Sequence, residues 1–460
     1  PMIAFPFHPS NAYTIREFLS NPEDILAEVE LKAQKQIANP ALHLNLRSKL
    51  RNGRFRVDQA DIAGCSGGSF ENLVHAARIL DGKAIPNEFF TMSAYPASNP
   101  VLMELLKTGY IQKLISAGVI MKPSFCGPCF GAGDVPSNGS IAIRHTTRNF
   151  PNREGSKPAE MQMSSVALMD ARSIAATAAN GGYLMAATDA EYDDSAPEYH
   201  FDAGIYCKTV YNGFGNPKPE TEIRMGPNIT DWPKMVALQD NAVLTVCSVI
   251  QDPVTTTDEL IPSGDTSSYR SNPIRMSEFT LMRRDPAYVG RAKITQQAET
   301  AREKGLPEEI KEKMAAQITA AGLTDEPEKL WENTEIGSVV CSVRPGDGSA
   351  REQAASCQRV LGGLANICIE YATKRYRSNL INWGMIPFTC DPELIERIEN
   401  GDNIFITHVR EAVLSCKSSV DAWLLREGQK PEKIQLFLKN LTKEEADIIA
   451  AGCLINYYSV

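Results

Sequence analysis

The sequence predicts an α/β protein whose first domain is built on a mostly parallel sheet. Strand-like segments alternate with helical ones through about the first 190 residues, and this alternation is typical of parallel strands joined by helical crossovers. Two of the strand-like segments run into glycine-rich turns that contain cysteine, AGCSGGS at 63–69 and FCGPCFGAG at 125–133. Functional groups in such sheets collect on loops beyond the carboxyl ends of the strands, so both turns are candidate site loops.

The first domain begins with a helical pattern over residues 21–38, in which Asn21 is a plausible N-cap ahead of Pro22. We then expect strands at the start of 56–69, 88–98 and 119–129, and helices over 71–80, 99–118 and 162–182. The last of these segments is rich in small residues, which favours a tightly packed helix. A polar stretch rich in Pro, Asn and Gly follows, as expected for a linker.

The second domain opens with the strand pattern AVLTVCSVI at 242–250. Its further expected elements are charged helices over 293–322, a strand over 338–345, a turn into a helix at 346–353 and helical structure over 358–376. The predicted domains are therefore residues 1–188, a linker at 189–235, and residues 236–460.

Composition limits the possible functions. The 460 residues carry a formal charge of −9, with acidic and basic residues interspersed, which argues against a nucleic-acid-coating surface. We find no apolar run long enough to span a membrane. Eleven widely spread cysteines do not resemble a secreted disulfide scaffold and indicate a reducing, cytoplasmic setting. Cys247 and Cys368 are expected to be buried thiols.

The CGPC stretch at 126–129 allows three interpretations. A thioredoxin-like redox pair needs a helix that begins at the first cysteine, and Phe-Gly-Ala-Gly is a poor helix start. A structural zinc site needs four ligands, and the chain has no second C-x-x-C. If the parallel sheet brings Cys65 to the pair, three thiolates could hold three corners of an iron–sulfur cluster.

Four motifs, taken together and in order, resemble the aconitase superfamily: AGCSGGSFENL, CGPCFGAGD, TTRNFPNREGS and GDGSAREQAA. Its members dehydrate and rehydrate hydroxy dicarboxylic or tricarboxylic acids on a [4Fe–4S] cluster. The resemblance implies an aconitase-type three-layer α/β domain with a parallel sheet, linked to a swivelling β/β/α domain. It also implies a hydroxy-polycarboxylate substrate.

The same resemblance implies roles for individual residues. The cluster ligands would be Cys65, Cys126 and Cys129. The substrate-binding arginines would be Arg148, Arg153, Arg270 and Arg351, since guanidinium groups suit carboxylates. Ser349 would be the general base and Asp258 an active-site acid. Taken singly, each arginine is also an ordinary surface residue, and Ser349 an ordinary N-cap.

This chain departs from the family pattern at four places. The family usually has serine where Ala350 stands, asparagine where Thr147 stands, Thr-Asn in place of Ser66–Gly67, and histidine in place of Glu259. The ligands, the base and the arginines are kept while their neighbours change. We therefore expect a divergent hydratase rather than a housekeeping aconitase.

The resemblance covers the third domain, the linker and the fourth domain of an aconitase. We expect the N-terminal aconitase domains to be missing partners, the chain alone to be inactive, and its cluster to be lost in air. The alternative is a non-catalytic homologue that senses through the cluster or binds RNA.

Overall fold

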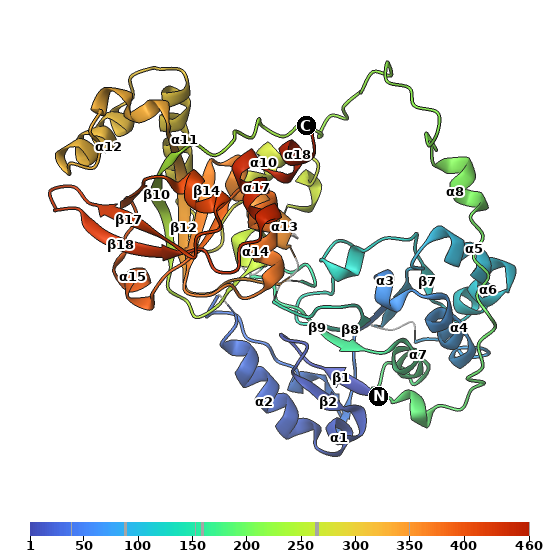
Figure 1. Cartoon of the computed structure of the whole chain (residues 1–460). Helices are drawn as coiled ribbons and strands as arrows, with labels where there is room; N and C mark the ends of the chain where they lie inside the picture. The colour runs from blue at the N-terminus through green and yellow to red at the C-terminus, as the bar shows by residue number, and fades with distance from the viewer. Residues whose placement is uncertain are drawn as a thin grey trace. The chain divides into compact units, whose positions relative to one another are not determined.

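The chain folds into two compact units, Pro1–Thr221 and Glu222–Val460, in the computed structural model. The structure describes residues 1–37, 39–86, 90–151, 153–157, 161–262, 266–348 and 350–459, apart from the side chain at 267. Each unit combines parallel strand pairs with helices (Figure 1), so the predicted α/β class is confirmed. The division at 221/222 falls inside the predicted linker.

The first unit is built on a seven-stranded sheet in the order β2-β1-β9-β8-β5-β6-β7. The five strands from β9 to β7 run parallel, whereas β1 pairs antiparallel with both β2 and β9. The strands are β1 Met2–Ala4, β2 Ala12–Thr14, β5 Gln59–Ile62, β6 Thr91–Ala94, β7 Ile120–Met121, β8 Ile141–His145 and β9 Ser165–Met169, with a separate hairpin of β3 Leu50–Arg51 and β4 Arg54–Phe55. The carboxyl ends of the parallel strands therefore share one edge.

Among the described residues, eight helices accompany this sheet, and four of them begin at a capping side chain. The helices are α1 Ile15–Ser20, α2 Pro22–Gln34, α3 Gly64–Gly67, α4 Phe70–Ile79, α5 Asn99–Lys107, α6 Tyr110–Ser116, α7 Ala171–Ala179 and α8 Gly204–Thr209. The side chains of Ser69, Ser98 and Asp170 accept from backbone N–H groups at the starts of α4, α5 and α7. Helix α4 contacts both α6 and α7, and α7 packs on β5 and β8.

The single helix expected over 162–182 is wrong in its first half. Ser165–Met169 form β9, a central strand of the sheet, and the helix α7 begins only at Ala171. The run VALM is largely buried between the neighbouring strands β1 and β8 and carries no period that separates strand from helix. Asp170 directly follows the strand and is the N-cap of α7, because its carboxylate accepts from the N–H of Ser173 at 2.9 Å.

The second unit contains a closed barrel in the order β10-β12-β14-β15-β18-β17-β16. Its strands are β10 Asn241–Ile250, β12 Thr334–Ser342, β14 Gly363–Cys368, β15 Ile386–Thr389, β16 Asn403–Ile406, β17 Ser419–Leu425 and β18 Glu432–Phe437, and β11 Thr255–Thr256 pairs with β13 Pro345–Asp347 outside it. The helices are α9 Thr257–Leu260, α10 Pro273–Ser277, α11 Tyr288–Glu303, α12 Glu309–Ala320, α13 Arg351–Val360, α14 Lys374–Asn382, α15 Pro392–Arg397, α16 Val409–Leu414, α17 Lys443–Ala451 and α18 Leu454–Tyr458. In the described ranges, no helix has the length and apolar character needed to cross a bilayer.

The continuous helical structure expected over 358–376 is also wrong. Helix α13 ends at Val360, and the following residues Gly363–Cys368 form the barrel strand β14. Gly362 has a φ of +82°, a conformation that stops the helix. The apolar run LANIC is buried throughout, so a short hydrophobic stretch again carried no periodic signal. Cys368 is fully buried as expected, as is Cys247 in β10.

Candidate functional site

Cys65 lies on the short helix α3, directly beyond the end of β5. The turn enters through Gly64 at a φ of +73°, and the Cys65 side chain is exposed. Two glycines allow this turn to lie against its neighbours. A Cβ on Gly67 would overlap the carbonyl oxygen of His145, and one on Gly68 would overlap that of Tyr95. The departure from the family's asparagine at position 67 thus has a steric reason in this chain.

Asn72 fixes the same turn, a role that its place in the AGCSGGSFENL motif did not reveal. Its side-chain amide on α4 donates to the carbonyl oxygens of Ser66 and Gly67, at 3.1 Å each. These two carbonyls follow Cys65 directly. The amide therefore holds the cysteine turn against the first turn of α4.

The CGPC pair lies beyond the end of β7, on the 3-10 helix η2 (Gly127–Cys129). Cys126 is exposed and Cys129 is half-buried. The Cys129 sulfur lies 3.4 Å from the hydroxyl oxygen of Thr147, so the residue that replaces the family's asparagine still contacts a thiol. Phe130 leaves helical geometry, and the pair therefore lacks the α-helix of a thioredoxin-like redox motif.

The two cysteine turns are in contact, because α3 packs against η2. All eleven cysteines are free thiols. Among the residues that the structure describes, no three His, Cys, Asp or Glu side chains are grouped tightly enough for a single metal ion. A single zinc ion therefore gains no support. An iron–sulfur cluster needs a different arrangement of ligands, because each corner iron takes its own thiolate and the thiolates need not converge on one ion. Three thiols that are not buried, on two contacting turns, suit that arrangement.

The loop after β8 carries the two predicted arginines of the first unit. Arg148 is half-buried and Arg153 is buried. Asn149 between them donates to the carbonyls of Ala4 and Phe5 at 3.0 and 2.7 Å, which ties the loop to the sheet. The Glu154 carboxyl is buried and bonded to the Ser156 hydroxyl, and its burial raises its pKa.

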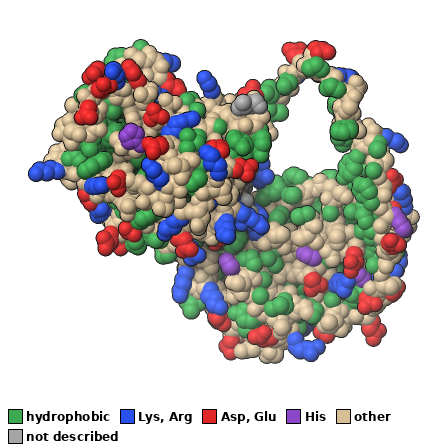
Figure 2. Space-filling model, in the orientation of Figure 1, with side chains coloured by type: hydrophobic (Ala, Val, Ile, Leu, Met, Phe, Trp, Pro, Cys, Tyr) green, Lys and Arg blue, Asp and Glu red, His purple; other side chains and the backbone are tan. Residues whose placement is uncertain are grey.

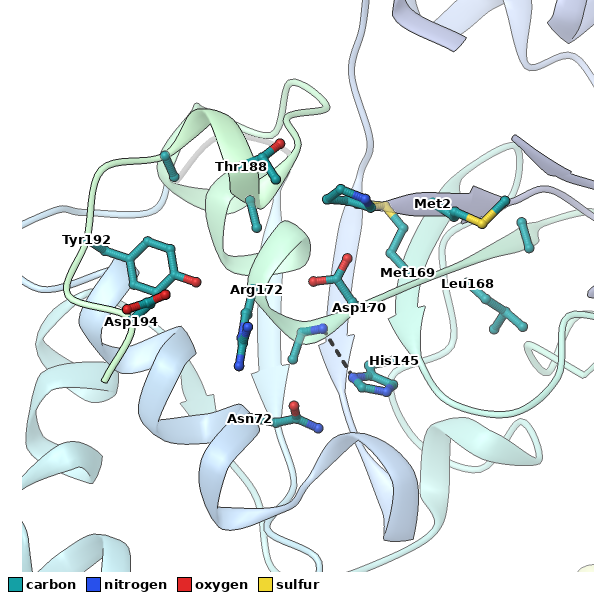
Figure 3. Close-up of a pocket in the computed structure, with 15 residues that line it drawn as sticks. Met2, Asn72, His145, Leu168, Met169, Asp170, Arg172, Thr188, Tyr192 and Asp194 are labelled. Atoms are coloured by element: carbon teal, nitrogen blue, oxygen red, sulfur yellow. Dashed lines mark hydrogen bonds between the residues drawn. The ribbon is translucent and has the colours of Figure 1, made fainter. Parts of the chain in front are cut away.

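A pocket of about 850 Å³ opens at the same edge of the sheet, where β8 and β9 end (Figure 3). His145 and Asp170 line it from the strand ends, Arg172 from α7 and Asn72 from α4. The His145 Nδ1 accepts from the N–H of Ala171 at 3.1 Å, and burial lowers the pKa of His145. Asn72 thus links this pocket to the Cys65 turn, although none of the predicted site residues lines it.

In the second unit, the two predicted motifs are joined by a small sheet. Strand β11 pairs with β13, so that Thr256 lies opposite Asp347, and the helix α9 contacts α13. Asp258 on α9 forms an ion pair with Arg283 at 2.9 Å, and Arg351 is the first residue of α13. Arg270 is exposed, just beyond the 3-10 helix η5 (Ser267–Tyr269). The predicted base, Ser349, lies outside the described residues.

The surface charge agrees with the mixed composition. Figure 2 shows Lys and Arg interspersed with Asp and Glu on the face in view. This distribution does not favour the RNA-binding alternative.

The fold and the thiol turns define a class of α/β domain with a cysteine site at the carboxyl edge of a parallel sheet. Comparison with known proteins shows what the first unit is similar to. Residues 1–176 match the aconitase family (aconitate hydratase), so this part of the chain is similar to the aconitase and isopropylmalate isomerase superfamily.

Several curated relatives are large subunits of 3-isopropylmalate dehydratase. The protein from Caldanaerobacter subterraneus subsp. tengcongensis is 33% identical over 157 residues, which cover 34% of this chain and 36% of the relative. The protein from Mycolicibacterium smegmatis is 36% identical over 121 residues, covering 26% and 28%. The chain thus spans about a third of the length of the curated relatives it matches.

One solved structure is weakly similar, a 3-isopropylmalate dehydratase from Methanocaldococcus jannaschii. It is 20% identical with a TM-score of 0.27, covering 48% of this chain and 94% of that one. A likeness of this size carries no argument about fold or function.

Proposed function

We propose that this chain carries the thiols and the base of an iron–sulfur hydro-lyase, which removes and re-adds water on a hydroxy dicarboxylic or tricarboxylic acid. One observation carries the proposal. The three motif cysteines lie on two contacting turns at the carboxyl edge of one parallel sheet, and none of them is buried. The match of residues 1–176 to the aconitase family and the similarity to large subunits of 3-isopropylmalate dehydratase support the hydro-lyase class.

The cofactor would be a [4Fe–4S] cluster held by Cys65, Cys126 and Cys129. When bound through three thiolates, such a cluster supplies one open iron, a Lewis acid for a substrate hydroxyl. The chain's own part is to present the thiols. Thr147 adds a hydroxyl beside Cys129, and Asn72 orients the turn of Cys65.

The remaining predicted residues would bind and deprotonate the substrate. Guanidinium groups bind carboxylates in a planar, bidentate manner, and this is the proposed role of Arg148, Arg153, Arg270 and Arg351. Ser349 would take a proton from the carbon beside a carboxylate. Arg351 and the backbone N–H groups of the first turn of α13 would stabilise the alkoxide form of the serine that takes this proton. Asp258, oriented by Arg283, would act as the acid.

Anaerobic reconstitution with iron and sulfide tests the cofactor assignment. We expect a brown protein with the visible absorbance and, after reduction, the paramagnetic signal of a cluster. Cys126→Ser should abolish both. The matched control is Cys207→Ser, because Cys207 is exposed in α8 and lies in none of the motifs. Full colour in Cys126→Ser, or none in the wild type, would contradict the assignment.

Turnover tests the reaction. We propose that the chain alone is inactive and needs a partner polypeptide to complete the substrate pocket, since the match covers about a third of its relatives. The first substrates to test are 3-isopropylmalate, which the relatives' name suggests, and citrate. Measurable turnover by the isolated, reconstituted chain would refute the need for a partner. A cluster held there should also bleach within hours of exposure to air, because none of the three thiols that would hold it is buried.

A further inference from the structure

Arg144 connects the core of the sheet to the CGPC turn. It lies on β8 with 1% of its surface exposed. Its Nε donates to the carboxylate of Asp61 on β5 at 2.8 Å. Its two terminal nitrogens donate to the backbone carbonyls of Pro128 and Asp134, at 2.7 Å each. Pro128 stands between the two cysteines of the turn, so one guanidinium binds the middle and the far end of this loop.

The far end is also held through its side chain. The Asp134 carboxylate accepts from the Tyr95 hydroxyl and, at 3.1 Å, from the Ser93 hydroxyl, both at β6. Asp134 itself has a φ of +49°, a conformation that an aspartate adopts less readily than a glycine. The backbone bond to Arg144 and the two side-chain bonds therefore fix an unusual loop conformation from opposite sides.

Only arginine can make this set of contacts. Its planar group directs several N–H donors at fixed angles, whereas lysine offers one compact ammonium group. The pair is expensive to bury, because both Arg144 and Asp61 are removed from water. A sheet needs no such pair between β5 and β8, whose backbones already bond in parallel register. The cost of burying the pair is explained if the CGPC turn, which Arg144 binds, must keep one conformation.

We propose that Arg144, clamped by Asp61, is a positioning residue that sets the separation and direction of the Cys126 and Cys129 thiols. The inference rests on the proposed function, in which these thiols are cluster ligands. Without the two carbonyl bonds, the CGPC turn loses its attachment to β8. The Cys65 turn keeps its own, because Asn72 holds it independently.

The test compares Arg144→Lys with the wild-type chain. The matched control is Arg302→Lys in the second unit. The Arg302 side chain is only 8% exposed, pairs with Glu299 at 2.6 Å and donates to the carbonyl of Trp331 at 3.0 Å. Alkylation rates of each cysteine in the apo chain are measured by peptide mapping with iodoacetamide. Iron bound per chain is measured after anaerobic reconstitution, and folding by circular dichroism.

We expect Arg144→Lys to fold. The ratio of the alkylation rates of Cys126 and Cys129 to that of Cys65 should change at least about fivefold, and at least half of the bound iron should be lost. Arg302→Lys should leave both values unchanged. An unchanged ratio in folded Arg144→Lys would overturn the inference. Loss of the folded first unit in both Arg144→Lys and Asp61→Asn would also overturn it, because it would show a general structural role. A wild type that binds no iron refutes the proposed function, while the alkylation ratio still decides the role of Arg144.

Discussion

The backbone N–H of Ala350 donates to the hydroxyl oxygen of Thr257 at 3.2 Å. This bond joins two segments that are far apart in the sequence, the TTTDEL stretch with Asp258 and the residue directly before α13. It complements the β11–β13 pairing, which brings the same segments side by side. The predicted acid Asp258 and the residue directly before α13 thus belong to one local structure in the second unit, a relation that motif spacing alone does not reveal.

Gly348 is essential to that structure, and Gly348→Ala should damage it. Gly348 has a φ of +125°, and a Cβ there would overlap the Thr257 hydroxyl. We expect a loss of about 1–3 kcal/mol in the free energy of unfolding of the second unit. All four tryptophans, at 232, 331, 383 and 423, lie in this unit, so tryptophan fluorescence in urea measures the change.

Gly401→Ala is the control for Gly348→Ala. Gly401 also has a positive φ, of +95°, but a Cβ there would meet nothing within 4 Å. Its substitution therefore reports backbone strain without a clash. Equal losses in the two variants would show that the contact with Thr257 contributes nothing.

The Cys65 turn should be equally intolerant of a side chain at Gly67. Gly67→Ala places a Cβ against the carbonyl of His145, and backbone atoms of a central strand cannot easily move away. We expect Gly67→Ala to lose bound iron after reconstitution and to lower the thermal midpoint of the first unit. Ser66→Ala, which changes the neighbouring side chain only, should retain both. Normal iron binding by Gly67→Ala would contradict the close approach of α3 to β8.

Thiol reactivity should divide the cysteines by burial. We expect iodoacetamide at pH 7.5 to modify Cys65, Cys126 and Cys129 in the native apo chain. Five others should react only after unfolding, because burial raises the pKa of each thiol: Cys247 to about 11, Cys390 to about 12, and Cys341, Cys357 and Cys368 well above the usual range. Peptide mapping with and without 8 M urea, a concentration of the order used for complete unfolding, checks the division. Labelling of any of these five thiols in the native chain at the rate of Cys65 would contradict it.

The sequence predicted the α/β class and the surroundings of the cysteine turns because both depend on local signals. Alternating elements and glycine-rich turns can be recognised from neighbouring residues. Two assignments were wrong for one physical reason, since VALM and LANIC are short, largely buried apolar runs without a period. The Arg144–Asp61 pair could not be found in this way. Each residue stands in a strand-like segment, and their charge pairing appears only when β5 and β8 lie side by side.

Glu335 should make the stability of the second unit depend on pH. It is buried at the start of β12, where it faces Arg359 at 3.8 Å, Glu299, Arg302 and the N–H of Gln239. Burial, opposed mainly by Arg359, raises its pKa from 4.5 to about 7. The folded state therefore binds a proton that the unfolded state releases between these values. The free energy of unfolding should fall as pH rises from about 4.5 to 7, by at most about 3 kcal/mol from this group.

Glu335→Gln, which mimics the protonated carboxyl, should flatten this slope. Tryptophan fluorescence in urea at pH 5, 6, 7 and 8 measures it in the second unit alone, because the first unit has no tryptophan. Glu432→Gln is the control, since Glu432 is an exposed partner of Arg397 and exposed pairs contribute little. We expect the wild type and Glu432→Gln to lose stability in parallel above pH 5, while Glu335→Gln loses less. Parallel curves for all three would show that Glu335 is ionised in the folded chain at pH 5, and that Arg359 compensates its burial more fully than the raised pKa implies.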